Sequence, residues 1–223
     1  MRAMIRFGKE QRVRFISHLD LQRFFQRALN RTGLPIAYTQ GFNPHPVMSF
    51  ASALALGWTS EYEILDFKLA VPMGRVRTEE AMRKALPGTF PIYETRMVED
   101  RFPAPMRLVT ASDYRVIPDP ADLDAILEAA QIFMKSEQVR AVRKTKSGER
   151  EVDIRPFVLD MRFEEGALLV RLMLTEKESL RPDLLMRSLY AISGLEERRA
   201  FIHRLTLLGK GNGEELSPLM ELT

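Results

Sequence analysis

The residues best suited to chemistry lie together in one loop-forming segment, Gln40-Gly41-Phe42-Asn43-Pro44-His45-Pro46. Its prolines fix the backbone φ angle and remove N–H donors, so we expect a stiff loop that holds its side chains in place. On such a loop Phe42 can stack on an unpaired nucleic-acid base, or its ring can be buried under the sheet and anchor the loop. Asn43 can hydrogen-bond to a base edge. His45 can serve as a general base toward a ribose 2′-hydroxyl group. The segment therefore predicts contact with RNA, for recognition or for cleavage.

An amphipathic helix is expected immediately before this loop, and its polar side carries arginines. Ser17 begins the helix with Asp20 three residues on, close to a capping box, and Gly33 ends it. The expected apolar stripe consists of Leu21, Phe24, Phe25, Ala28 and Leu29. The polar side consists of Arg23, Arg27, Asn30 and Arg31. Residues 1–40 contain eight basic and two acidic side chains, and this local excess favours a surface that faces a polyanion. The alternative is a solvated helix face without a partner.

A second basic segment is expected at residues 138–158, where two extended runs flank a turn. Each phosphate contact made by such a segment would add a salt-dependent contribution to the affinity for RNA. We expect Lys144 and Lys146 to be outlying phosphate contacts. The alternative is a solvated edge hairpin whose charges resist aggregation. The basic residues are Arg140, Arg143, Lys144, Lys146, Arg150 and Arg155, and the acidic residues beside them are Glu149, Glu151 and Asp153.

The hydrophobic pattern predicts an α+β protein with two tandem ferredoxin-like domains. Residues 1–98 show the order β-α-β-β-α-β. Within them, a first strand region is expected over 2–8 and 11–15, and Thr78 is expected to cap the second helix. The order recurs over residues 107–209 with one extra β-hairpin. Residues 210–223 are expected to form a polar tail.

Composition narrows the chemistry that the chain can perform. The 223 residues include no cysteine, which excludes disulfides, iron–sulfur ligation and thiolate zinc sites. Only three histidines occur, widely spaced, so we expect no metal site. Neither GxxxxGK[ST] nor GxGxxG is present, and we expect no cofactor. The apolar runs are too short to cross a bilayer, and we expect a cytoplasmic protein without membrane contact.

Two stretches of the sequence carry a resemblance to a known family: FISHLDLQRFFQRALNRTGLPIAYTQGFNPHPVMSFASALALGWTSE and EVDIRP. They resemble the radical-SAM-linked protein family, a bacterial family defined by a domain of unknown function. The most specific matches are HLDL, QGFNPHP and SFASAL, although the family usually has a lysine near Val47. The resemblance implies a radical SAM protein as partner and no established activity. The chain lacks the CxxxCxxC cluster of a radical SAM enzyme, so it is not that partner itself.

A looser similarity links the chain to the RNA-binding RAMP proteins of CRISPR systems. Those proteins also combine tandem ferredoxin-like domains with glycine-containing loops beside the RNA. The shared features are the order of the elements and the Gly41–Pro46 loop. This similarity is an analogy of fold, and a fold alone does not determine function.

Three functions follow from these observations. The leading hypothesis is a non-catalytic RNA-binding accessory protein that acts with a radical SAM enzyme in RNA modification or processing, with transfer and ribosomal RNA among the candidate ligands. One alternative is a metal-independent endoribonuclease that uses His45. Another is a protein-interaction scaffold for the radical SAM partner, without RNA contact, whose interface core would be Met48, Phe50 and Trp58. The residues expected to bind RNA are Arg23, Arg27, Arg31, Gln40, Phe42, Asn43, His45, Lys144 and Lys146.

Overall fold

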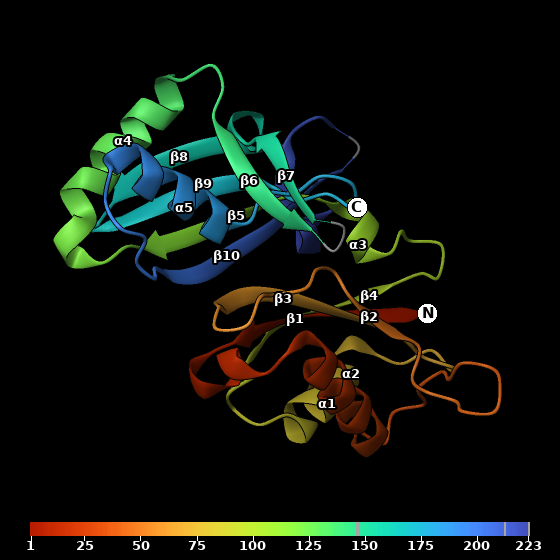
Figure 1. The fold of residues 1–223 in the computed structure, drawn as a ribbon. Coiled ribbons are helices and arrows are strands. Elements are labelled where there is room, and N and C mark those ends of the chain that lie inside the picture. Colours follow the sequence, from red (N-terminus) through yellow and green to blue (C-terminus); the bar gives the residue numbers. More distant parts are fainter. Residues whose placement is uncertain (146–147, 212, 223) are drawn as a thin grey trace. The chain divides into compact units, whose positions relative to one another are not determined.

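The computed structural model describes residues 1–145, 148–211 and 213–222. The described chain is of the α+β class, with five α-helices and mainly antiparallel strands. It divides into two compact units (Figure 1). Unit 1 consists of Met1–Val109 together with Leu207–Thr223, and unit 2 consists of Thr110–Thr206. None of the described helices is long and apolar enough to cross a membrane.

Unit 1 contains an antiparallel sheet with the strand order β4-β1-β3-β2. Helices α1 and α2 lie on the same side of this sheet (Figure 1). The elements, in chain order, are β1 (Arg2–Lys9), α1 (His18–Arg31), β2 (Met48–Phe50), β3 (Thr59–Lys68), α2 (Arg75–Ala85), β4 (Ile92–Val98) and the short α3 (Pro105–Leu108).

The core of unit 1 forms between α1 and the sheet. Ser17 accepts a hydrogen bond from the Asp20 N–H at 3.2 Å, which satisfies a free N–H at the start of α1. The helix then buries Leu21, Phe25, Ala28 and Leu29. The Phe25 ring lies 4.8 Å from that of Phe7 on β1. The helix expected after Ser17 is therefore confirmed, together with its apolar stripe.

Two local expectations in unit 1 are wrong. The strand expected over residues 11–15 is a 3-10 helix, Gln11–Phe15, because Gln11 has a φ of 49° and interrupts the extended backbone. Helix α2 begins after Gly74, before the expected cap at Thr78. The Thr78 hydroxyl instead donates to the Gly74 carbonyl at 3.0 Å, one turn back in the helix.

The C-terminal segment packs on the face of the unit 1 sheet opposite α1. The Met220 N–H donates to the Tyr62 hydroxyl at 3.1 Å, and Arg96 Nη1 donates to the Met220 carbonyl at 3.1 Å. Leu219, Met220 and Leu222 are buried, and β11 (Leu216–Pro218) pairs with β10 (Phe201–Lys210). The described part of residues 210–223 is thus not the polar tail that was expected, because its apolar residues bury themselves against the sheet.

Unit 2 repeats the alternation of strands and helices. Its main sheet has β10 beside β5, followed by β9 and β8, and β6 and β7 form a separate two-stranded sheet. The basic hairpin expected at 138–158 corresponds to β6 and β7. The elements, in chain order, are β5 (Val109–Ile117), α4 (Leu123–Lys135), β6 (Arg140–Thr145), β7 (Gly148–Asp153), β8 (Val158–Glu164), β9 (Ala167–Met173), α5 (Pro182–Ser193) and β10.

A buried carboxylate in unit 1 makes stability depend on pH. Asp66 on β3 lies opposite Met4 on β1 and is 5% exposed. Burial raises the pKa of Asp66 from 3.8 to about 6, although Arg2 acts in the opposite direction and its Nε lies 3.6 Å away. The folded state therefore holds this proton more tightly than the unfolded state does. Stability should fall as the pH rises from about 4 to about 6, and the loss should persist at higher pH.

We expect Asp66→Asn to remove this dependence, because an amide does not ionise. The free energy of unfolding of the variant, minus that of the unsubstituted protein, should be roughly 1–2 kcal/mol larger at pH 7.5 than at pH 4.5. Urea unfolding at the two pH values measures the difference. Asp124→Asn, at an exposed position on α4, is the matched control and should give the same difference at both pH values. A pH-independent effect of Asp66→Asn would contradict the raised pKa.

Candidate nucleic-acid interface

The loop between α1 and β2 is closed at its base by main-chain and side-chain hydrogen bonds. The Thr39 N–H donates to the His45 carbonyl at 2.9 Å, and the His45 N–H donates to Thr39 Oγ1 at 3.1 Å. Tyr38 and Pro46 form an antiparallel bridge below this pair. Gly41 has a φ of 119°, a conformation that other residues rarely adopt. These contacts fix the stem of the loop, so residues 40–45 project from a defined base.

Phe42 lies at the exposed end of this loop. Its relative exposure is 111%, so neither face of the ring is covered by the described chain. The alternative of an aromatic side chain buried under the sheet is therefore wrong. The loop, orange in Figure 1, extends away from α1 and α2. Gln40, Asn43 and His45 are exposed beside it.

A hydrogen bond joins the loop stem to the arginine side of α1. Tyr38 Oη donates to Asn30 Oδ1 at 2.7 Å. Asn30 is exposed and lies between Arg27 and Arg31 on the polar side of the helix. The loop and the helix therefore share one connected surface, which we call the α1–loop surface. It consists of Arg23, Arg27, Asn30, Arg31, Gln40, Phe42, Asn43 and His45.

The α1–loop surface carries excess positive charge. Arg23 lies 3.5 Å from Asp20, but both side chains are exposed and such a pair contributes little. Arg31 Nη2 donates to the Ala85 carbonyl at 3.2 Å, which holds the guanidinium in place without neutralising it. Arg27 makes no ion pair with any described residue. Three arginines therefore face solvent with one carboxylate among them.

His45 contributes its main chain to the loop and leaves its ring exposed. No hydrogen bond, ion pair or ring contact involves that ring within residues 1–145, 148–211 and 213–222. His18 differs, because its ring packs against Phe50 with 5.6 Å between centroids. No group of three histidine, aspartate or glutamate side chains in the described chain is arranged to hold a metal ion. The surface offers binding groups, and the described residues add no acid–base partner to His45.

Most of the chain, including this surface, matches the model of a known sequence family. A model for uncharacterized proteins conserved in bacteria, DUF2344, matches residues 2–182. The chain belongs to the DUF2344 family. The expectation of a bacterial family of unknown function is confirmed at this level. The match includes the whole α1–loop surface and the β6–β7 hairpin of the DUF2344 chain. No curated protein matches the chain.

The basic hairpin of the DUF2344 chain belongs to unit 2, and several of its charges serve internal contacts. Arg140 Nη1 lies 3.3 Å from Glu151 Oε2. Arg155 donates to the carbonyls of Val158 and Met134, both at 3.2 Å. Lys144 lies in β6, but its side chain is outside the described part of the chain, as is the whole of Lys146. The described hairpin therefore offers fewer available cations than its sequence suggests.

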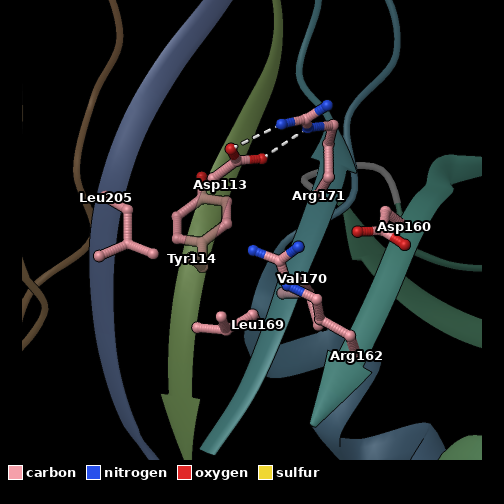
Figure 2. A pocket seen from close by; sticks show the side chains of 8 residues that line it. All are labelled: Asp113, Tyr114, Asp160, Arg162, Leu169, Val170, Arg171 and Leu205. Atoms are coloured by element: carbon pink, nitrogen blue, oxygen red, sulfur yellow. Dashed lines mark hydrogen bonds and ion pairs between the residues drawn. The ribbon is translucent and has the colours of Figure 1, made fainter. Parts of the chain in front are cut away.

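Figure 2 shows a small cavity in unit 2 of the DUF2344 chain that sequence reasoning missed. Asp113 accepts two hydrogen bonds from Arg171, at 2.8 and 2.9 Å, and this pairing raises the pKa of Arg171 above its ordinary value. The two residues are 58 positions apart, so no local spacing reveals the pair. The cavity measures about 70 Å³, far below the roughly 300 Å³ at which small-molecule pockets begin. We assign it no ligand.

The residues expected to form a protein interface in the DUF2344 chain lie mostly in its core. Phe50 is 8% exposed and its ring lies 5.5 Å from that of Phe25. Met48 packs against the same cluster, and Trp58 is half-buried. These side chains therefore stabilise unit 1 and do not provide an exposed apolar centre for a partner.

Proposed function

We propose that the chain is a non-catalytic RNA-binding protein whose contact area is the α1–loop surface. The observation that carries this proposal is the hydrogen bond between Tyr38 and Asn30. It joins the loop that carries the exposed Phe42 ring to the side of α1 that carries the exposed arginines. Arginine guanidiniums bind phosphates, and an exposed ring accepts the face of an unpaired base. The combination suits single-stranded RNA or an RNA loop, whose bases are free to unstack.

The stiffness of the loop supports binding with little ordering cost. Thr39 and His45 already exchange hydrogen bonds, and the loop prolines restrict the backbone further. A preorganised loop loses less conformational entropy when it meets a ligand. His45 and Asn43 then supply hydrogen-bonding groups at fixed positions near Phe42.

We infer that the RNA-binding protein acts with a radical SAM enzyme in RNA modification or processing. This part of the proposal rests on the resemblance of the HLDL, QGFNPHP and SFASAL segments to the radical-SAM-linked family. We further infer that both units are ferredoxin-like, as in the RAMP proteins. The strand orders β4-β1-β3-β2 and β10-β5-β9-β8 support this inference, with β6 and β7 as an inserted hairpin in unit 2.

Phe42→Ala should weaken RNA binding without changing stability. Loss of one base–aromatic stacking contact corresponds to roughly a 5- to 150-fold weaker affinity. Because the ring contacts nothing in the described chain, the melting temperature should stay the same.

Retention of total cellular RNA on the purified protein identifies a ligand, and its affinity is then measured by fluorescence anisotropy. Phe15→Ala, at another exposed aromatic outside the α1–loop surface, is the matched control. Equal affinity for both variants would remove Phe42 from the contact area.

Arg27→Gln should reduce both the RNA affinity and its dependence on salt. If Arg27 contacts one phosphate, the slope of log affinity against log salt should decrease by about 1. Arg77→Gln changes the same charge at an exposed position on α2 and should leave the slope unchanged. Affinity that does not respond to salt would contradict the phosphate contacts.

The same binding reactions distinguish the other two functions. RNA fragments that appear with the unsubstituted protein and disappear with His45→Ala would replace the binding role with an endoribonuclease. Absence of RNA retention at both low and moderate salt would reject both RNA functions. A pull-down of the radical SAM partner by the RNA-free protein would then favour the scaffold.

A further inference from the structure

Unit 2 contains a positively charged cavity that takes no part in the α1–loop surface. The cavity measures about 350 Å³ and lies between β6 and the start of α5. These two elements contact each other within unit 2 (Figure 1). Arg143, Arg181 and Arg187 line the cavity, and Asp183 is the only carboxylate that lines it within the described chain. Three positive charges therefore face one negative charge in a space large enough for a small ligand.

Protein contacts hold two of these arginines while leaving donors available. Arg143 Nη2 donates to the carbonyl of Ser179. Arg187 Nε donates to Glu197 Oε2 at 3.2 Å. A guanidinium has five N–H donors, and within the described part of the chain each of these bonds uses one of them. Because the donors lie in a rigid planar fork, arginine suits the tetrahedral oxygens of a phosphate.

The third arginine, Arg181, is paired with a carboxylate of the same lining. Asp183 accepts hydrogen bonds from Arg181 Nε at 3.0 Å and from Arg181 Nη2 at 2.7 Å. Asp183 offsets the charge of Arg181, and Glu197, which lies outside the lining, offsets that of Arg187. The net attraction for an anion therefore comes mainly from Arg143, and Arg187 adds hydrogen-bond donors. Val142 and Leu184 add apolar surface to the lining. A phosphate attached to a small organic body matches this combination better than inorganic phosphate does.

We propose that this cavity binds a phosphate monoester, carried by a nucleoside monophosphate or by the 5′ end of an RNA. The charged oxygens contact Arg143 and Arg187, and the organic body lies against the apolar lining. The site is in unit 2 and does not depend on RNA binding by the α1–loop surface in unit 1.

Two matched pairs of probes test this site on the full chain by calorimetry. The first pair is adenosine 5′-monophosphate and adenosine. The second is a short RNA with a 5′-phosphate and the same RNA with a 5′-hydroxyl. At least one phosphate-bearing probe should bind about tenfold or more tightly than its partner, the scale of one charge-assisted hydrogen bond. Preference within both pairs identifies a mononucleotide-sized ligand, and preference within the RNA pair alone identifies an RNA end. Equal binding within both pairs overturns the proposal.

Three substitutions in the lining and two outside it sharpen the assignment. Arg187→Gln should reduce the preference for phosphate several-fold, because Arg143 remains, and Arg187→Lys should restore part of it. Asp183→Asn should increase the affinity several-fold, because it removes the carboxylate from the lining. Arg162→Gln, at an exposed arginine on β8 outside this cavity, should change nothing. Equal losses in Arg187→Gln and Arg162→Gln would overturn the site. Phe42→Ala should leave binding of the monophosphate unchanged, which separates this site from the α1–loop surface.

Discussion

Gly209→Ala should destabilise the folded protein by about 3 kcal/mol or more, at the upper end of what overpacking costs. A Cβ at this position in β10 would lie 2.4 Å from the carbonyl oxygen of Leu108 and 2.7 Å from Leu219 Cδ2. The leucine side chain can rotate away, but the carbonyl oxygen belongs to the main chain. Relief of the clash therefore requires the backbone to shift. Urea unfolding followed by circular dichroism measures the loss.

Gly211→Ala is the matched control for this substitution. The nearest atom to its added Cβ would be Leu222 Cδ2 at 3.4 Å, an ordinary contact distance. We expect stability to change little or to rise slightly, because alanine restricts the unfolded chain. Similar losses for both variants would indicate a general intolerance of the segment to side chains. Unchanged stability for Gly209→Ala would contradict the close approach of the two backbones.

Leu219→Ala should cost about 2–5 kcal/mol of stability, the usual range for a buried leucine. Leu219 is 0% exposed, and it lies in the segment that the sequence suggested would be a polar tail. Its loss leaves a cavity against the unit 1 sheet and weakens the packing of the neighbouring Met220. Urea unfolding measures the loss of stability. Hydrogen exchange at the Met220 amide should also become faster, because looser packing weakens the hydrogen bond from that N–H to the Tyr62 hydroxyl.

Leu195→Ala provides the contrasting result. Leu195 is 40% exposed and follows α5 in unit 2. Its truncation should change stability by no more than about 0.5 kcal/mol, as is usual for surface positions. If the two leucine variants lose the same small amount, residues 213–222 do not pack as described. A large loss for Leu219→Ala alone supports their place in unit 1.

Local signals were sufficient to predict α1 and the face that it buries. Ser17, the spacing from Leu21 to Leu29, and Gly33 all agree, and each acts within one or two helical turns. The projecting loop follows from Pro44 and Pro46 in the same way. The exposure of Phe42, by contrast, was left open between a stacking platform and a buried side chain. Only the tertiary contacts of a side chain decide between these alternatives.

The remaining features depend on residues far apart in the sequence. The apolar residues from Leu216 to Leu222 follow a glycine-rich stretch, and their local pattern does not reveal the strands on which they pack. The cavity between β6 and α5 joins Arg143 to Arg187 through tertiary contact alone. Such pairs have no characteristic spacing. Composition showed that arginines are abundant, and the structure was needed to show which of them face a common space.

The discontinuity of unit 1 has a consequence for synthesis on the ribosome. Unit 2 is a continuous run of chain, whereas unit 1 is completed by residues after Leu207. Tyr62 and Arg96 emerge early, but the Met220 groups that they contact emerge only after all of unit 2 has been translated. At typical translation rates this delay is on the order of ten seconds. During that interval one face of the nascent sheet lacks its final covering, so this is the stage at which a chaperone would have a surface to protect.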